Sequence, residues 1–196
     1  MRKYLLIAAF SLCAGVCAGQ APWKFRSDNY FGLAAGEVGE QGHLQTVNGL
    51  YKGPWFLGLG AGVDDYRYRS IPLFLSVTRD LPAFGNRSGL FLYLEGGIDL
   101  PWYKRTLNAY QEQMIISDKF QAGPWGSAGL GYKWRICART DKALLFSAGY
   151  SMKKLTEKVV SKSQCYTYSC PLEPMQQTYI YDYLNHTFLF LVGFRF

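Results

Sequence analysis

The last eleven residues of the chain, 186–196, place the strongest constraint on its fold. Five apolar residues recur there with a strict period of two and so share one face of a predicted β-strand: Phe188, Phe190, Val192, Phe194 and Phe196. The opposite face is mixed and includes Thr187, Gly193 and Arg195. A strand of this length with one apolar face and one mixed face is typical of a transmembrane β-barrel wall. We therefore predict that this segment closes a barrel in an outer membrane.

The N-terminus has the pattern of a secretory signal peptide. Arg2 and Lys3 precede an apolar run at residues 4–16, and small residues follow up to Gly19. We predict a signal peptide at residues 1–19, a short lead at 20–28 and one barrel domain at 29–196. Cys17 leaves lipoprotein-type cleavage open as an alternative.

Composition and charge narrow the classes of function. The chain combines 17% aromatic residues with 21 glycines, which suits many short strands and tight turns. After the predicted signal peptide, no apolar stretch is long enough for a transmembrane helix. The 21 Lys and Arg residues exceed the 14 Asp and Glu residues, but the excess is scattered. Nucleic-acid binding is therefore not expected.

Alternation of apolar with small or polar residues repeats along the chain. It is clearest at residues 55–66, where Leu57 and Leu59 alternate with glycines. Glycines on one face suit a narrow eight-stranded barrel, whose interior is only just wide enough for side chains. Eight strands are predicted, at about 29–38, 43–51, 55–66, 73–80, 90–99, 127–134, 144–151 and 186–196.

The connections between these strands alternate in length. Short turns are predicted at residues 51–54, 81–88 and 135–142. The opposite rim would carry residues 39–42 and 65–70 and two long loops at 100–123 and 153–183. Such asymmetry is typical of outer-membrane barrels, in which the short turns are periplasmic. An even number of strands places both chain termini at that rim.

Six sequence blocks together carry a family resemblance. They lie at residues 44–51 (LQTVNGLY), 56–63 (FLGLGAGV), 71–75 (IPLFL), 94–97 (LEGG), 129–132 (GLGY) and 192–196 (VGFRF). With these blocks the chain resembles the small outer-membrane β-barrel proteins common in Bacteroidetes-type bacteria, which share the architecture of OmpA- and OmpX-like barrels. The resemblance implies a location in the cell outer membrane. It also implies that the barrel-assembly machinery reads Phe194 and Phe196 as an assembly signal, and it carries no catalytic residues.

Two sets of side chains follow from the barrel prediction. The inward faces would hold five charges, which should pair because an unpaired charge is costly away from water. We expect them to form a polar plug in the lumen, in preference to an ion path: Asp64, Glu95, Asp99, Lys133 and Arg195. An aromatic belt is expected where outward-facing residues cross the membrane interface: Trp55, Tyr132, Trp134 and Tyr150.

The loops at 100–123 and 153–183 are the predicted contact regions. Cys165 and Cys170, in an exported protein, suggest a local disulfide. Lysines at the start of the last loop would contact lipopolysaccharide phosphates among the outer-membrane lipid, and its tyrosines would extend the hairpin above the membrane or bind an unknown surface ligand. With His43 and His186 as the only histidines, no metal is expected. No cofactor is expected either.

Two other readings remain open. In a soluble exported β-barrel that binds an apolar ligand, Leu57, Leu59 and their equivalents would point inward. In an outer-membrane lipid-modifying enzyme, His43 or His186 would meet a nucleophile and an acid at the outer rim. Nothing in the spacing indicates such a meeting. We predict that both histidines lie at the membrane interface and that the protein is not an enzyme.

Overall fold

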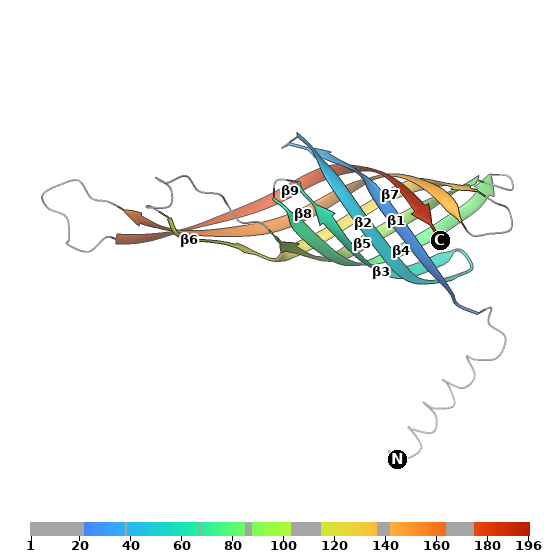
Figure 1. Ribbon diagram of the computed structural model, residues 1–196, viewed down its shortest axis with the longest axis horizontal. Helices are drawn as coiled ribbons and strands as arrows, with labels where there is room; N and C mark the ends of the chain where they lie inside the picture. Colours follow the sequence, from blue (N-terminus) through green and yellow to red (C-terminus); the bar gives the residue numbers. More distant parts are fainter. Residues whose placement is uncertain are drawn as a thin grey trace, which may run out of the picture.

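The computed structural model describes residues 22–37, 39–66, 68–84, 88–102, 115–136, 142–163 and 175–196, which form nine β-strands in one antiparallel sheet (Figure 1). The strands are β1 (Lys24–Gly36), β2 (Gly39–Lys52), β3 (Trp55–Asp64), β4 (Ser70–Phe84), β5 (Ser88–Pro101), β6 (Ile115–Gln121), β7 (Gly123–Arg135), β8 (Ala143–Ser163) and β9 (Met175–Arg195). Over these ranges, no helix has the length and apolar character needed to span a membrane. The predicted signal peptide lies outside the described residues.

Eight of the strands close into a ring in the order β1-β2-β3-β4-β5-β7-β8-β9. The ring closes because β9 pairs with β1 from Gly36 opposite Thr187 to Asp28 opposite Arg195. Beyond this pairing, the backbones of Ser27 and Phe196 exchange two hydrogen bonds of 2.9 and 3.1 Å. The eight-stranded antiparallel barrel predicted from the sequence is thus confirmed, including the closing role of the last strand.

The barrel begins earlier in the chain than predicted. Residues 24–28, predicted to belong to the lead, are the first residues of β1 and pair with residues 47–51 of β2. Arg26 and Asp28 are buried and continue the inward-facing series of β1. The predicted lead therefore contains the start of the first strand, and its charged residues face the lumen.

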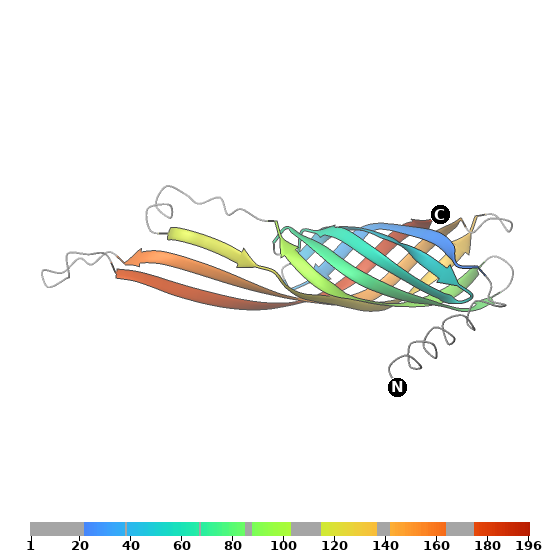
Figure 2. The ribbon, with the colours of Figure 1, turned by 90° about the horizontal axis from the view of Figure 1, so that it is seen from below.

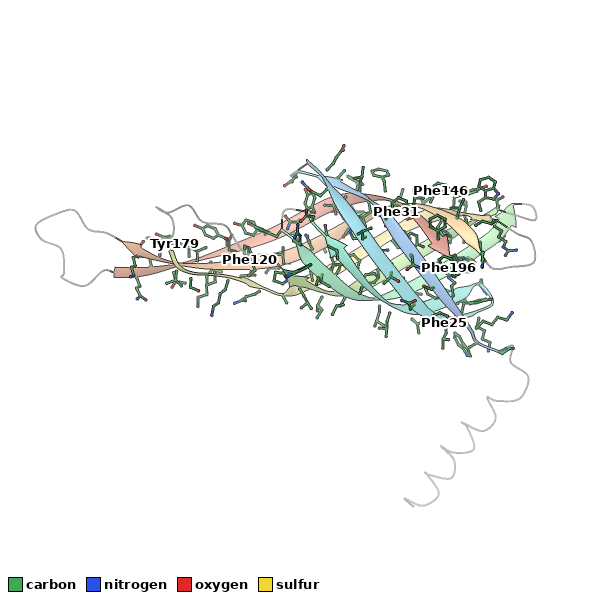
Figure 3. The ribbon with its side chains drawn as sticks, in the orientation of Figure 1. Phe25, Phe31, Phe120, Phe146, Tyr179 and Phe196 are labelled. Carbon is green, nitrogen blue, oxygen red and sulfur yellow. The ribbon has the colours of Figure 1, made fainter. Side chains whose placement is uncertain are left out.

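The outer face of the wall is largely apolar, apart from a hydrogen-bonded polar group on β1 and β2 formed by Ser27, Asn29, Thr46 and Asn48. Phe25, Phe31, Phe146 and Phe196, labelled in Figure 3, are all exposed. The aliphatic face of β3 is exposed in the same way, and Leu59 has 69% of its surface accessible. The prediction that the aliphatic faces point outward is confirmed, and the soluble barrel with an apolar interior is excluded. Other exposed members of this face are Leu57, Leu73, Leu75, Leu92, Leu94, Leu130, Phe188 and Phe190.

Inside the wall, large rings lie directly against glycines. Phe74 is the cross-strand partner of Gly60, and Phe91 is the partner of Gly131. A Cβ atom added at either glycine would overlap the opposing ring. Bulky and minimal residues therefore pack side by side on neighbouring strands inside the narrow lumen, as the glycine-rich faces predicted.

The substitution Gly60→Val tests this packing. It should lower the free energy of unfolding by about 1–3 kcal/mol, because the added methyl groups force the Phe74 ring out of its place. Urea unfolding of the protein refolded into lipid vesicles measures the change. Ala61→Val is the matched control, since Ala61 lies on the outer face of the same strand. Equal losses in the two variants would contradict the packing argument.

The last two strands continue far beyond the barrel. β1 accompanies β9 only to Thr187, and β7 accompanies β8 only to Lys153. β8 and β9 remain paired as far as Ser163 and Met175, with β6 along the other edge of β8. Figures 1 and 2 show these strands extending from the end of the barrel opposite Phe196. We call the part formed by β6, residues 154–163 of β8 and residues 175–186 of β9 the projecting sheet.

The projecting sheet corrects several predicted connections. The segment 153–183, predicted as a loop, is strand at residues 153–163 and 175–183, and the segment 100–123 contains β6. Residues 39–42, predicted as an outer connection, belong to β2. The sequence prediction ended each strand where its apolar face ended. The strands of the projecting sheet were missed because their composition is polar.

Candidate functional site

The lumen next to the chain termini holds a network of ion pairs, which we call the terminal cluster: Arg26, Asp28, Asp80, Lys133 and Arg195. Asp28 accepts hydrogen bonds from Arg26 Nε at 3.0 and 3.1 Å and from Arg195 Nε at 2.9 Å. Arg195 also lies 3.5 Å from Asp80, which pairs in turn with Lys133. Three cations and two carboxylates thus link strands β1, β4, β7 and β9 across the lumen.

The aromatic lining of the lumen supports this network. The Arg26 guanidinium lies 3.9 Å from the centroid of the Phe56 ring, and Arg195 lies 5.7 Å from that of Phe91. Cations over ring faces gain electrostatic stabilisation, most strongly where water is excluded. The rings therefore hold the guanidinium groups in place as well as filling space.

A second group, the distal cluster, lies toward the opposite rim: Asp64, Ser70, Asp99 and Lys153. Lys153 Nζ is 3.0 Å from Asp64 Oδ2, 3.3 Å from Ser70 Oγ and 3.8 Å from Asp99 Oδ2. All four side chains are buried. The ammonium group of Lys153 thus forms ion pairs with two carboxylates, those of Asp64 and Asp99.

Between the two clusters lies a hydrogen-bond network in which uncharged side chains surround Glu95. Ser127 and Ser76 donate to its carboxylate at 2.7 and 3.2 Å, and Gln45 lies at 3.5 Å. His43 contacts Gln45 at 3.0 Å. A void of about 10 Å³ beside this network has room for about one water molecule.

The rim at the terminal end opens into a hollow of about 460 Å³. Its lining includes Arg79, Arg135 and the Asp80–Lys133 pair. Asp80 and Lys133 therefore form the floor of the hollow as well as part of the terminal cluster. Solvent that enters from this rim meets the terminal cluster directly.

The projecting sheet continues the inward-facing series of the barrel as a tyrosine-rich face. Tyr179, Tyr181 and Tyr183 stack along β9 with ring centroids 6.4 Å apart. Tyr68, from the connection between β3 and β4, packs 4.6 Å from the ring of Phe120 and 5.9 Å from that of Tyr183. Figure 3 marks Phe120 and Tyr179 on this part of the molecule.

Glu157 joins this face to the barrel rim. It accepts hydrogen bonds from the hydroxyl of Tyr183 at 2.9 Å and from that of Tyr68 at 3.5 Å. Burial, together with the neighbouring carboxylate, raises the pKa of the Tyr183 hydroxyl above its ordinary value. Tyr183 therefore remains a neutral donor at physiological pH, and the base of the projecting sheet is tied to the β3–β4 connection.

The two histidines lie on opposite faces of the wall. His43 lies within β2, buried in the lumen, so its predicted position at the membrane interface was wrong. His186 lies on the outside, where its ring Nδ1 contacts the Tyr150 hydroxyl and its ring stacks on Tyr150. The structure does not bring these histidines together.

The predicted inward charges are all buried, but only some are paired as expected. Arg195 and Lys133 join the terminal cluster, and Asp64 and Asp99 the distal one. Glu95 differs from the expectation, since its contacts are with uncharged side chains. Sequence reasoning missed five lumen residues: Arg26, Asp28, His43, Asp80 and Lys153. Extending the period of two beyond the apolar segments would have found Arg26, Asp28 and Lys153.

The remaining predicted residues divide between the outer face and undescribed regions. Trp55, Tyr132, Trp134 and Tyr150 are exposed on the outer face. Phe194 and Phe196, also exposed, end the closing strand. Cys165 and Cys170 lie outside the described residues.

Comparison with solved structures identifies proteins of similar fold. The chain is similar to the crystal structure of the outer membrane protein OprG from Pseudomonas aeruginosa, with a TM-score of 0.58. The match covers 90% of this chain and 97% of OprG at 12% sequence identity. No protein-family model matches the chain, and no curated protein sequence matches it. At this identity the likeness establishes the fold, which is that of an outer-membrane β-barrel.

The location of the protein follows from its fold together with the apolar outer surface of the barrel wall. A closed barrel with an apolar exterior and a polar, charge-paired interior is the inverse of a soluble protein. Its outer surface must contact lipid, and among membrane-spanning structures a closed barrel leaves no backbone edge unpaired. By architecture, this is an outer-membrane protein.

Proposed function

We propose that this protein is a non-conducting outer-membrane barrel that anchors the projecting sheet at the cell surface as a contact surface. The observation that carries the proposal is the series of interactions across the lumen. The terminal cluster, the Glu95 network and the distal cluster follow one another along the barrel axis. An ion would have to break buried pairs at two levels, and the structure offers it no compensating site there.

The same observation supports a polar plug formed by Asp64, Glu95, Asp99, Lys133 and Arg195 with their partners. The protein is not an enzyme in this proposal, because His43 is inside the wall and His186 is outside it. The tyrosine-rich face supplies contact area of the kind used in protein recognition, with rigid rings and polar tips. The ligand it contacts is a surface component not specified by the geometry.

The proposal also covers how the barrel is assembled and which family it belongs to. Phe194 and Phe196, at the end of the closing strand, act as the signal read by the barrel-assembly machinery. The sequence blocks that resemble Bacteroidetes-type barrels support membership of that branch. We also propose that Cys165 and Cys170 form a disulfide.

The first test is electrical. Purified protein reconstituted into planar lipid bilayers should give no stepwise conductance above the lipid background in 1 M KCl, because paired side chains close the lumen. A general porin reconstituted in the same way is the positive control. Regular channel openings by the wild-type protein would refute the closed-lumen part of the proposal.

The second test concerns orientation and display. In a background with Cys137, Cys165 and Cys170 replaced by serine, the variant Gln176→Cys should react with a membrane-impermeant maleimide on intact cells. Lys142→Cys, at the opposite rim, should react only after the outer membrane is permeabilised. The reverse pattern would show that the projecting sheet faces the periplasm.

A further inference from the structure

The outward face of the projecting sheet is strongly basic, in contrast to its tyrosine-rich inner face. Four exposed lysines lie on it: Lys119, Lys154, Lys158 and Lys162. Over the described residues, this face has one ion pair, between Lys154 Nζ and Asp182 Oδ2 at 3.8 Å. The face therefore carries a net positive charge with little internal compensation. We call it the lysine face.

Two of these lysines directly oppose each other. Lys119 of β6 is the register partner of Lys158 of β8. Like charges at opposed positions of neighbouring strands destabilise a sheet. An anion held between the two ammonium groups would remove this repulsion. The pairing thus indicates a binding position for a negatively charged group.

The lysine face is continuous with the lipid-facing wall. On β8 the same face carries Phe146, Tyr150 and Met152, all exposed, and then Lys154. On β9 the residues paired with Lys154 and Lys158 are Leu184 and Ile180, which are 54% and 65% exposed. Aliphatic and basic side chains therefore alternate just beyond the apolar belt, at the level of lipid headgroups.

We propose that the lysine face binds the phosphate groups of a phosphorylated glycolipid in the outer leaflet. The proposal rests on the orientation given under the proposed function. Lys154 and Lys158 are separated by about 13 Å along the strand, at about 3.3 Å per residue. A headgroup with several phosphates can meet both positions, whereas one phosphate cannot. The neighbouring Leu184 and Ile180 contact the apolar part of the same lipid.

The experiment uses the full mature protein in detergent, titrated with fluorescent lipopolysaccharide. The variant K119A/K154A/K158A should bind at least about tenfold more weakly, because each basic residue near a charged lipid surface strengthens attraction severalfold. The matched control K24A/K52A/K142A removes the same charge near the opposite rim and should bind within about twofold of wild type. Heat-modifiable gel mobility verifies that each variant is folded.

Three further comparisons test whether the binding signal comes from the phosphate groups of the lipid. Enzymatically dephosphorylated lipopolysaccharide should bind as weakly to wild type as intact lipopolysaccharide binds to the triple variant. Inorganic phosphate at millimolar concentration should not displace the lipid; full displacement would indicate a site for a free anion and overturn the proposal. Unchanged binding by the triple variant, or an equal loss in the control, would also overturn it.

Failure of this inference is distinguishable from failure of the proposed function. If the maleimide experiment places Gln176→Cys at the cell surface while the lysine variant binds normally, only the glycolipid site is refuted. If residue 176 is not reached from outside the cell, the orientation itself is wrong. In that case the binding experiment in detergent no longer concerns the outer leaflet.

Discussion

Replacement of Asp28 by alanine should lower the free energy of unfolding by about 3–5 kcal/mol, the largest effect expected of a single substitution in this protein. Asp28 is the carboxylate that pairs with both Arg26 and Arg195. Its loss leaves two buried guanidinium groups next to each other without the carboxylate that both of them contact. Urea unfolding in lipid vesicles, with gel mobility as a second measure, gives the magnitude.

Two variants make the Asp28 result specific. Asp65→Ala breaks the exposed pair with Arg69, whose side chains are 47% and 54% exposed, and should cost about 0–1 kcal/mol. Replacing Arg26, Asp28 and Arg195 together by Met, Leu and Met should recover most of the stability, because no charge is then left unpaired. If the triple variant is as unstable as Asp28→Ala, lost packing rather than unpaired charge explains the effect.

Replacement of Lys153 by alanine should have a comparable cost at neutral pH, about 3–5 kcal/mol. Without the ammonium group, Asp64 and Asp99 are two buried carboxylates with no cation between them. Urea unfolding in lipid vesicles at neutral pH measures the loss.

The neighbouring residue supplies the control for Lys153. Lys154 carries the same charge one position along β8 but points outward, where its pair with Asp182 is half exposed. Lys154→Ala should change stability by about 0–1 kcal/mol. Equal effects of the two substitutions would mean that the distal cluster does not stabilise the barrel.

The barrel itself could be predicted because its wall obeys one simple rule. Lipid requires an apolar outer face, so Leu57, Leu59, Phe188 and Phe190 recur at a period of two wherever the chain crosses the membrane. The number of strands and the asymmetry of the rims follow from counting these segments. The narrow lumen follows from the glycines that alternate with them.

The projecting sheet and much of the lumen network escaped prediction for the opposite reason. Beyond the membrane, both faces of a strand may be polar, so residues such as Lys158 and Gln176 give no alternating apolar signal. Partners in the lumen are set by the three-dimensional register. Asp28 meets Arg195 only because the first and last strands pair, and Asp80 reaches the same cluster from β4. No spacing within the sequence encodes these meetings.

The closure between β1 and β9 also has a kinetic consequence. Asp28 and Arg195 are 167 positions apart, so the pair forms only after nearly the whole chain has been placed. Contacts between such distant residues carry a large entropic cost before they give any stabilisation. Until they form, Asp28 and Asp80 lack their contacts with Arg195, and two strand edges remain open. Closure should thus be the late, slow and all-or-none step of folding, in which sealing of the wall and neutralisation of the lumen occur together.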